Sequence, residues 1–455
     1  MFPTVKRIHF VGIGGIGMSG IAEILVNKGF QITGSDCSHS ENTEHLEKLG
    51  VKVFYGHAKN NINDAEVVVY SSAVDTATNP EIVEANLRKI PIIRRAEMLA
   101  EISRLNYCIA ISGTHGKTTC TSMIALVLIK AGIDPTVVVG GRLKDLGGTN
   151  ARLGNGNWTI VEADEYDRSF LQLTPSIAVI NNLEAEHLDI YEDFANLKST
   201  FAQFANMTPF YGFIAAGIDC CGVIEVLPEL RKKVITYGLA DGSDYQAKNI
   251  SYQGFSSTCD VYEYGKFLGK MTVSVPGAFN IKNALSAVLI ARQFDVEFDL
   301  ISSVISEFNG AFRRFEIKGT KNNVTVIDDY AHHPTEVKAT LLGLKNSKKR
   351  VIAVFQPHTF TRTKDFYADF AESFVDADIV FITDIYPARE KPIEGITGKL
   401  IVDTAEQKGI RNINYVPQKE NLCAEIRNIL QPNDVVITLG AGDIWQVADE
   451  LIEQM

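Results

Sequence analysis

The sequence predicts an α/β protein built from parallel sheets and divided into two or three domains. Its 455 residues exceed the length at which a single hydrophobic core usually keeps growing. Short apolar runs alternate with helical patterns along most of the chain, as expected for buried parallel strands joined by crossover helices. Two of the junctions between a strand and a helix are rich in glycine, which is typical of loops that bind phosphate groups.

The composition is that of an ordinary folded protein, with 45% hydrophobic, 22% charged and 9% aromatic residues. A formal net charge of -11 gives no general attraction to nucleic acid or to anionic membranes. No apolar run reaches the roughly 18 residues of a membrane span, and the glycines in the N-terminal run argue against a signal peptide. The seven cysteines lack C-x-x-C spacing, so we expect reduced thiols and a cytoplasmic location.

The N-terminal residues 6–29 predict a strand, a glycine turn and a helix. Gly12, Gly14 and Gly17 fit the pattern G-x-G-x-x-G, and Asp36 stands at the end of the next apolar run. Such glycines let a diphosphate approach the N-terminus of a helix, and the carboxylate can accept a hydrogen bond from a ligand. The alternative is that the glycines only pack the helix against the strand.

Further apolar runs at residues 51–55, 67–72 and 91–94 continue this parallel sheet. Ser71 and Ser72 stand at the C-terminal end of one run, where open α/β sheets bind ligands. Capping of the next helix is an equally good interpretation of these serines. A lone loop histidine, His57, is interpreted as an incidental surface residue.

The segment YCIAISGTHGKTT, residues 107–119, joins an apolar strand to a Gly-Lys-Thr turn and a helical pattern. In a phosphate-binding loop, Gly113 and Gly116 would let backbone N–H groups close round phosphate oxygens. Lys117 would add a positive charge, and the Thr118 hydroxyl could bind Mg²⁺. The first glycine of the usual pattern is missing, so a variant of the loop is predicted.

Two further strands are predicted to end near this loop. The sequence VEADE presents Glu162, Asp164 and Glu165, and one of these carboxylates is expected to hold Mg²⁺ or to orient a reacting water or amine. The sequence NNLEAEHLD begins at the end of an apolar run and contains His187, which by itself would be interpreted as structural. Three strand ends in one α/β domain together predict a nucleotide and metal site.

Residues 245–275 change to short alternating runs, which predict an antiparallel excursion. In the helix that follows, Asn280 and Asn283 could read an adenine edge or simply cap the helix. A new strand and helix series begins at residue 324. Its strand ends, DDYAHHP and QPHTFTR, are interpreted as substrate contacts, because no recognised metal-ligand spacing is present.

The ordered motifs GIGGIGMSGIA, GTHGKTT, VEADE, NNLEAEHLD, FNIKNA, RRFE, DDYAHHPTE and QPHTFTRT closely resemble the Mur ligase family over essentially the whole chain. The resemblance implies three domains. They are an N-terminal Rossmann-like UDP-binding domain at 1–104, a central P-loop ATPase domain at 105–312 and a C-terminal Rossmann-like domain at 313–455. It also implies that L-alanine is joined to the lactyl carboxylate of UDP-N-acetylmuramate through an acyl phosphate.

The implied cofactors are ATP and Mg²⁺, with Mn²⁺ as a substitute, and the implied protein is a monomer or weak homodimer that binds no nucleic acid and enters no membrane. By resemblance, Lys117 contacts the β- and γ-phosphates, Thr118 and Glu162 hold one Mg²⁺, and His187 holds a second. The rest of the nucleotide site is implied to comprise Gly113, Thr114, His115, Gly116, Thr119, Asn280, Asn283, Arg314 and Asp329. The amino acid or the reaction intermediate is implied to lie among Tyr330, His332, His358 and Arg362. The UDP moiety is implied to face Gly12, Gly14, Gly15, Ile16, Gly17, Ser35, Asp36, Ser71 and Ser72.

Two residues receive no role. Thr359 stands where some relatives carry arginine, and Lys198 lies at the wrong spacing from the metal histidine for the modified lysine of related ligases. Three other functions remain open. A ligase that recycles a tripeptide onto the same sugar nucleotide fits nearly as well. An NAD-dependent oxidoreductase would leave the phosphate loop without use, and a nucleotide-dependent switch would leave the C-terminal histidines without use.

Overall fold

The computed structural model describes residues 2, 4–143, 146–186 and 188–455, and the chain divides into two compact units. One unit comprises Met1–Ala247, Val261–Gly269 and Lys282–Val304, and the other comprises Lys248–Asp260, Lys270–Ile281 and Ile305–Met455. Their sheets are largely parallel, so the predicted α/β class is confirmed. In the described part of the chain, every helix is too short or too polar to cross a bilayer.

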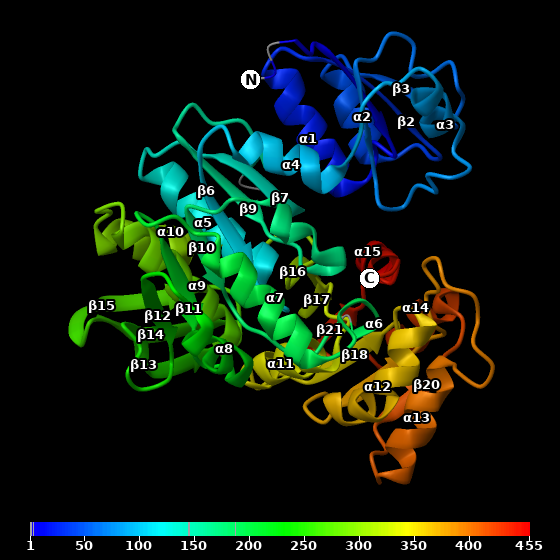
Figure 1. Ribbon diagram of the computed structural model, residues 1–455. Coiled ribbons are helices and arrows are strands. Elements are labelled where there is room, and N and C mark those ends of the chain that lie inside the picture. The colour runs from blue at the N-terminus through cyan, green and yellow to red at the C-terminus, as the bar shows by residue number, and fades with distance from the viewer. Residues whose placement is uncertain (1, 3, 144–145, 187) are drawn as a thin grey trace. The chain divides into compact units, whose positions relative to one another are not determined.

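The N-terminal sheet, blue in Figure 1, has five parallel strands in the order β3-β2-β1-β4-β5. The strands are β1 (Arg7–Val11), β2 (Gln31–Asp36), β3 (Lys52–Tyr55), β4 (Val67–Tyr70) and β5 (Ile92–Arg94). The helices are α1 (Ile16–Asn27), α2 (Glu41–Lys48), α3 (Pro80–Leu87) and α4 (Arg95–Ser103). Val11 lies opposite both Ser35 and Tyr70, so β1, β2 and β4 end at the same edge.

Both faces of this sheet are buried. Ile8 and Phe10 of β1 pack with α1 and α4 on one face, whereas Val11 packs with Ile82 of α3 on the other. A strand covered on both sides reads as a continuous apolar run, which is why the sequence predicts it well. Pro80 and the Asn79 cap, which accepts from the N–H groups of residues 81 and 82, fix where α3 begins.

The central sheet has ten strands in the order β15-β14-β13-β12-β11-β10-β6-β9-β7-β8, and β13 through β7 of this order run parallel. The strands are β6 (Tyr107–Ser112), β7 (Thr136–Leu143), β8 (Thr149–Arg152), β9 (Trp158–Glu162), β10 (Ile177–Ile180), β11 (Phe213–Gly217), β12 (Val234–Gly238), β13 (Tyr245–Gln253), β14 (Ser256–Glu263) and β15 (Lys266–Val273). Glu162 pairs with Ile111 and Ile180 pairs with Ser112, so three strand ends meet at one edge.

The helices around this sheet include α5, which begins directly after the predicted phosphate loop. Residues 118–128 of α5 are all buried, and this stretch contains no charged residue. The helices and short 3-10 segments are α5 (Lys117–Lys130), η2 (Tyr166–Gln172), α6 (Leu188–Tyr191), α7 (Phe194–Asn206), α8 (Cys221–Val226), η3 (Leu227–Glu229), α9 (Ala278–Arg292) and α10 (Phe298–Glu307).

The C-terminal sheet, drawn from yellow to red in Figure 1, has six strands in the order β16-β17-β21-β18-β19-β20. Only β16 pairs in the antiparallel sense. The strands are β16 (Glu316–Lys321), β17 (Val324–Asp329), β18 (Val351–Phe355), β19 (Ile379–Ile382), β20 (Ile413–Tyr415) and β21 (Val435–Leu439). The helices are α11 (Pro334–Lys345), α12 (Phe360–Ser373), α13 (Gly398–Gln407), η4 (Lys419–Asn421), α14 (Leu422–Ile429) and α15 (Trp445–Gln454). Leu439 lies opposite Asp329 and Phe355, which brings the two polar strand ends together.

Candidate active site

The predicted phosphate loop connects β6 to α5, which begins at Lys117. Gly113 and Gly116 both have positive φ, at +143° and +77°. A Cβ atom added at Gly116 would lie 2.9 Å from both Asn181 Nδ2 and Asn283 Oδ1. Glycine is therefore needed on conformational and steric grounds. The turn delivers the chain to a helix N-terminus, whose N–H groups and dipole favour an anion.

Two asparagines at the end of β10 support the loop. Asn182 Oδ1 accepts a hydrogen bond from the His115 N–H at 2.7 Å, and the side-chain amides of Asn181 and Asn182 donate to the His115 carbonyl at 3.0 and 2.9 Å. Thr114 Oγ1 accepts from the Glu184 N–H at 2.9 Å. Thr114 and His115 are therefore fixed by the neighbouring strand end.

Lys117 points back into the loop. Its Nζ donates to the carbonyl oxygens of Gly113 and Thr114, at 2.6 and 3.3 Å, and to Glu165 Oε1 at 2.6 Å. Burial by itself would lower the pKa of Lys117, but the charges of Glu165 and Asp164 outweigh it and the pKa lies above its usual value. Burial also raises the pKa of Glu165, to about 7, against the opposing charge of Lys117. The ammonium is thus held, and kept charged, inside the loop.

The hydroxyl of Thr118 lies beside a carboxylate. Thr118 Oγ1 is 3.3 Å from Glu162 Oε2, and Glu162 Oε1 accepts from the Gly140 N–H at 2.7 Å. A hydroxyl and a carboxylate are the hard oxygen donors that Mg²⁺ prefers, so these two residues fit such an ion. Thr119 is buried in the same first turn of α5. His187, predicted to hold a second ion, lies outside the described residues.

The two asparagines of α9 have different surroundings. Asn283 Oδ1 accepts a hydrogen bond from Asn181 Nδ2 at 2.8 Å, which brings Asn283 next to the phosphate loop. Asn280 Nδ2 donates to the Pro276 carbonyl at 2.7 Å, in the turn that leads into the helix. This bond ties the Asn280 amide to the turn before α9, and both the adenine contact and the helix cap remain predictions for this residue.

The N-terminal glycine turn is braced by its neighbours. Asp36 Oδ2 accepts from the Gly14 N–H at 2.8 Å, and Asn42 Nδ2 donates to the Gly14 carbonyl at 2.7 Å. Gly12 has a φ of +81°, and a Cβ there would lie 3.1 Å from Ser71 Cβ. The turn, Asp36 and Ser71 therefore form one cluster, in which the carboxylate of Asp36 already holds the loop.

The remaining residues of this group lie around the start of α1. Gly15 is the N-cap, Ile16 is the first helical residue, and a Cβ at Gly17 would lie 3.0 Å from Arg95 Nη1. Ser72 is exposed at the end of β4. These positions share an edge of the sheet, as their order in the sequence predicts.

Ser35 lies in a buried polar network rather than on the surface. Its hydroxyl donates to Glu81 Oε2 at 2.5 Å and is 3.0 Å from His57 Nδ1. Glu81 is fully buried and also lies 3.4 Å from His9 Nε2 and 2.6 Å from Asn61 Nδ2. Burial opposes ionisation of Glu81, but the bonds from His9, Ser35 and Asn61 outweigh it and lower its pKa. His57, interpreted from the sequence as incidental, is part of this network.

Two neighbouring arginines at the start of the C-terminal sheet have different partners. Arg313 Nε donates to the buried Asp328 Oδ2 at 3.0 Å, and both guanidinium groups lie over the ring of Tyr330, at 5.0 Å for Arg313 and 4.8 Å for Arg314. Burial raises the pKa of Asp329 to about 6, against the charge of Arg314. The predicted Arg314, Asp329 and Tyr330 are thus brought together.

The two histidine motifs also meet. His332 lies between the rings of Tyr330 and His358, with centroid distances of 5.2 and 6.0 Å. Arg362 Nη1 is 3.4 Å from His358 Nδ1, and the His358 ring stacks on Tyr386 at 5.7 Å with a 15° interplanar angle. Burial and the charge of Arg362 lower the pKa of His358 to about 4, so the ring is neutral at pH 7.

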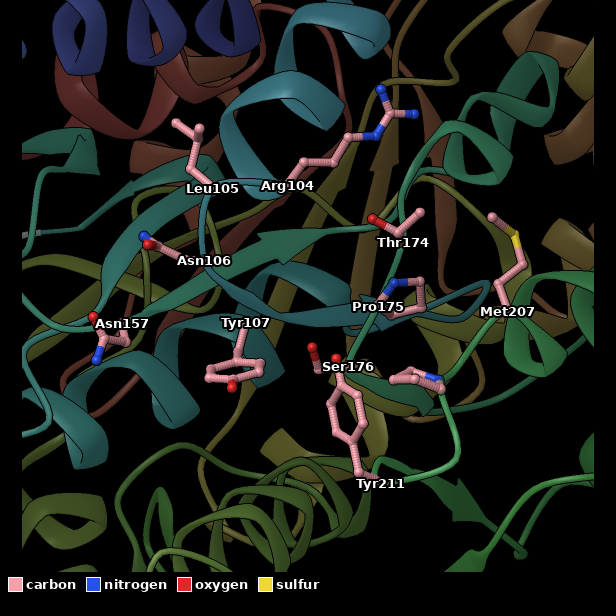
Figure 2. Close-up of a pocket in the computed structure, with 11 residues that line it drawn as sticks. Arg104, Leu105, Asn106, Tyr107, Asn157, Thr174, Pro175, Ser176, Met207 and Tyr211 are labelled. Atoms are coloured by element: carbon pink, nitrogen blue, oxygen red, sulfur yellow. The ribbon is translucent and has the colours of Figure 1, made fainter. Parts of the chain in front are cut away.

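A cavity of about 520 Å³ lies elsewhere, where β6, β9 and β10 begin (Figure 2). Arg104, Asn106, Tyr107, Asn157 and Tyr211 are among its lining residues, and none of the predicted site residues that the structure describes lines it. Parallel sheets bind their ligands where the strands end, so this cavity lies at the wrong edge to be the nucleotide site.

Three residues that shape these clusters were not assigned a role from the sequence. The sequence presents Glu165 only as one of three carboxylates after a strand, and it gives no signal for Glu81 or Tyr386. Glu81 follows the Asn-Pro start of a helix, which signals a helix but not a buried acid. Tyr386 belongs to a loop without a regular pattern, where its backbone pairs with His358.

Family models match three successive parts of the chain. They are described as "Mur ligase family, catalytic domain" for residues 7–107, "Mur ligase middle domain" for 111–291 and "Mur ligase, glutamate ligase domain" for 313–442. A UDP-N-acetylmuramate--L-alanine ligase from Geobacter sp. (strain M21) is 49% identical over 454 residues, which cover 99% of this chain and 98% of that protein. A ligase of the same name from Geotalea uraniireducens is 48% identical and covers 100% and 99% of the two chains.

Solved structures agree with these matches. The UDP-N-acetylmuramate-alanine ligase from Thermotoga maritima has a TM-score of 0.84 and 30% identity, and 98% of each chain is covered. A murein peptide ligase from Psychrobacter arcticus has a TM-score of 0.71 and 25% identity, again over 98% of each chain. The three family models match successive parts of the sequence, and the relatives match it over its full length. This chain therefore belongs to the Mur ligase family.

Proposed function

We propose that this chain joins L-alanine to the lactyl carboxylate of UDP-N-acetylmuramate at the expense of ATP, for peptidoglycan precursor synthesis. The products would be UDP-N-acetylmuramoyl-L-alanine, ADP and phosphate. The observation that carries the proposal is the loop after β6, where Lys117 and the Thr118–Glu162 pair meet at one sheet edge. Full-length relatives at 49% and 48% identity, which bear the name of that ligase, support the choice of substrates.

The chemistry explains why a phosphate loop is needed. A carboxylate is a poor electrophile, so it is first converted to an acyl phosphate by transfer of the γ-phosphoryl group. The amine of L-alanine then attacks the acyl carbon, and phosphate leaves. Phosphoryl transfer depends mainly on positioning and on neutralising charge. Lys117 and the N-terminus of α5 supply positive charge at this position.

The nucleotide site would use the residues named from the sequence. Thr118 and Glu162 would hold Mg²⁺, for which Mn²⁺ can substitute, and His187 would hold a second ion. When bound, the cation neutralises charge on the phosphate oxygens. Asn280, Asn283, Arg314 and Asp329 would complete the nucleotide site, together with the loop residues Gly113, Thr114, His115, Gly116 and Thr119.

The amino acid would bind at the cluster of Tyr330, His332, His358 and Arg362. The guanidinium group of Arg362 is suited to a carboxylate, and the neutral ring of His358 can accept a proton. The UDP moiety would bind at the edge where β1, β2 and β4 end. Its residues would be Gly12, Gly14, Gly15, Ile16, Gly17, Ser35, Asp36, Ser71 and Ser72, although the side chain of Ser35 is buried and donates to Glu81.

The proposed organisation has a substrate domain at 1–104, an ATP-binding domain at 105–312 and a C-terminal domain at 313–455. We place the protein in the cytoplasm, where its nucleotide substrates occur, as a monomer or weak homodimer. Sedimentation at micromolar concentrations measures this last point directly. A stable higher oligomer would contradict it.

A substrate-omission assay tests the reaction. Purified protein with ATP, Mg²⁺, UDP-N-acetylmuramate and L-alanine should release phosphate and form the amide only when all four are present. Phosphate release without L-alanine and without amide product would overturn the proposal. The tripeptide-recycling reaction is the second candidate, because a murein peptide ligase shares the fold at a TM-score of 0.71. Competition between L-alanine and the tripeptide decides between them, and preferred use of the tripeptide would favour the second.

A further inference from the structure

Glu165 has no role in the proposed reaction, yet it lies next to the most important cation of the loop. Its side chain is 3% exposed, and Oε1 is 2.6 Å from Lys117 Nζ. The other oxygen, Oε2, is buried and accepts no hydrogen bond from the described residues. A buried ion pair adds little net stability, because loss of hydration offsets the attraction. A buried carboxylate that is only half satisfied therefore points to a functional role.

The backbone holds this carboxylate in place. Tyr191 is fully buried, and its hydroxyl donates to the Glu165 carbonyl at 2.5 Å. The next turn contains Asp167 and Arg168, both with positive φ, and the Arg168 N–H donates to the same carbonyl at 3.0 Å. The position of Glu165 beside Lys117 is therefore built into the fold and is not one choice of a mobile surface side chain.

The surroundings of Lys117 also show what the carboxylate does not do. The carbonyl oxygens of Gly113 and Thr114 also bind the ammonium, so Glu165 is not the only group that holds it in the loop. A carboxylate oxygen on an ammonium resembles a phosphate oxygen in charge and in geometry. Glu165 thus takes the place beside Lys117 that a phosphate oxygen would take.

We propose that Glu165 is a positioning residue that binds the Lys117 ammonium in the nucleotide-free loop and competes for it with the phosphates of the nucleotide. The inference rests on the proposed function, because it assumes that the loop binds ATP and ADP. Entry of a nucleotide moves the ammonium from carboxylate to phosphate, and departure of ADP reverses the exchange. Glu165 therefore weakens nucleotide binding and favours product release.

The sign of the effect follows from this competition. In Glu165→Gln, the side chain keeps its size but loses its charge, so Lys117 exchanges a charge-assisted hydrogen bond for a weaker one. The nucleotide then has less to displace. We expect Mg-ADP to bind about tenfold more tightly, because a charge-assisted hydrogen bond is stronger than a neutral one by an amount that corresponds to about that factor in affinity. Glu165→Asp keeps the charge but is one methylene shorter, so its affinity should fall between wild type and Glu165→Gln.

The experiment is calorimetric titration of the full-length protein with Mg-ADP at pH 8, without sugar nucleotide or amino acid. The control is Glu225→Gln. It removes the carboxylate that pairs with a different lysine of the same unit, Lys198, whose Nζ lies 2.5 Å from Glu225 Oε2. This control should leave the ADP affinity unchanged. In steady-state assays, Glu165→Gln should lower the KM for ATP without raising kcat.

Two results would overturn the inference. One is an unchanged or weaker ADP affinity in Glu165→Gln, as a merely structural role would give. The other is an equal tightening in Glu225→Gln. If Glu165→Gln does not fold, the comparison of Glu165→Asp with wild type decides, because equal affinities would also overturn it. Failure of the proposed function is distinguishable, since wild type would then bind no Mg-ADP or would form no amide.

Discussion

Replacement of Arg313 by methionine should destabilise the C-terminal unit far more than the same change at its neighbour, Arg314. Arg313 donates to Asp328 at 3.0 Å and to the carbonyl oxygens of Gly440 and Gly442 at 2.6 and 3.0 Å. Asp328 is fully buried, so loss of the guanidinium leaves a buried carboxylate without its counter-charge. Breaking a buried pair from one side costs roughly 3–5 kcal/mol.

Protonation of Asp328 sets an upper limit to the unfolding free energy that Arg313→Met loses through this carboxylate. The carboxyl can become neutral, and its remaining partner is the Thr438 hydroxyl at 2.7 Å. The gap of roughly 4 units between pH 7.5 and its usual pKa of 3.8 corresponds to about 5 kcal/mol, at about 1.4 kcal/mol per unit. At pH 5 the same limit falls to about 2 kcal/mol. Burial already raises the pKa of Asp328 above its value in the unfolded chain, so the contribution of Asp328 to stability is lost as the pH rises. The difference in unfolding free energy between Arg313→Met and wild type should therefore be smaller at pH 5 than at pH 7.5.

The assay is thermal and urea unfolding of wild type, Arg313→Met and Arg314→Met at pH 7.5 and pH 5. Arg314 lies over the Tyr330 ring, a contact of roughly 0.5–1 kcal/mol, and its charge also favours the ionised form of the buried Asp329. Asp329 keeps the hydrogen bonds from the Phe315 and Ala331 N–H groups, so the Arg314 variant should lose less stability than Arg313→Met but bind ATP poorly. Adding Asp328→Asn to Arg313→Met should recover much of the loss. Equal destabilisation by the two arginine variants, or no recovery in the double variant, would refute this reasoning.

Three further predictions concern the candidate site. Lys117→Ala should lower kcat at least a hundredfold, because it removes a charge needed in the transition state, and near-normal turnover would contradict this. The melting temperature should change little, because Glu165, whose pKa burial raises to about 7, can take up a proton when Lys117 is lost. Gly116→Ala should weaken Mg-ADP binding at least tenfold and cost about 1–2 kcal/mol of stability, since a φ of +77° is unfavourable and the new Cβ would strike Asn283; calorimetry and urea unfolding measure both. His358 has a pKa of about 4, below the usual 6.5, so its contribution to stability is complete above pH 6.5 and lost towards pH 4. The loss should be about 3 kcal/mol, and a pH series of melts in which His358→Gln showed the same acid loss as wild type would contradict the assignment.

The parallel sheets and the glycine turn between β6 and α5 can be predicted from the sequence because their signals are local. Strands buried on both faces read as apolar runs, and the positive φ angles at Gly113 and Gly116 require glycine. The pairing of Ile111 with Glu162 then follows from the rule that parallel strands end at one edge. Each of these features is set by residues within a few positions of one another, so no distant partner has to be known.

The buried polar groups could not be predicted because their partners are distant in the sequence. Ser35 meets Glu81 across 46 positions, and His57 reaches the same carboxylate from another loop. A serine at a strand end looks the same in the sequence whether it faces a ligand or a buried acid. Only the packing of α3 against the sheet decides which of these occurs, and that packing is set by Ile82 and Ala85.

Glu162 and Glu165 contact different residues, and which of them each one contacts also depends on packing that the sequence does not display. Both carboxylates follow the apolar part of β9, and either could have served the cation or the lysine. The strand ends at Glu162, which therefore points along the sheet edge towards Thr118, whereas the turn carries Glu165 to Lys117. The Asp164 carbonyl in that turn accepts hydrogen bonds from the Phe170 N–H and the Ser169 hydroxyl, at 3.0 and 2.9 Å. Because no residue type in the turn demands these contacts, the sequence could name the two acids but could not divide their roles.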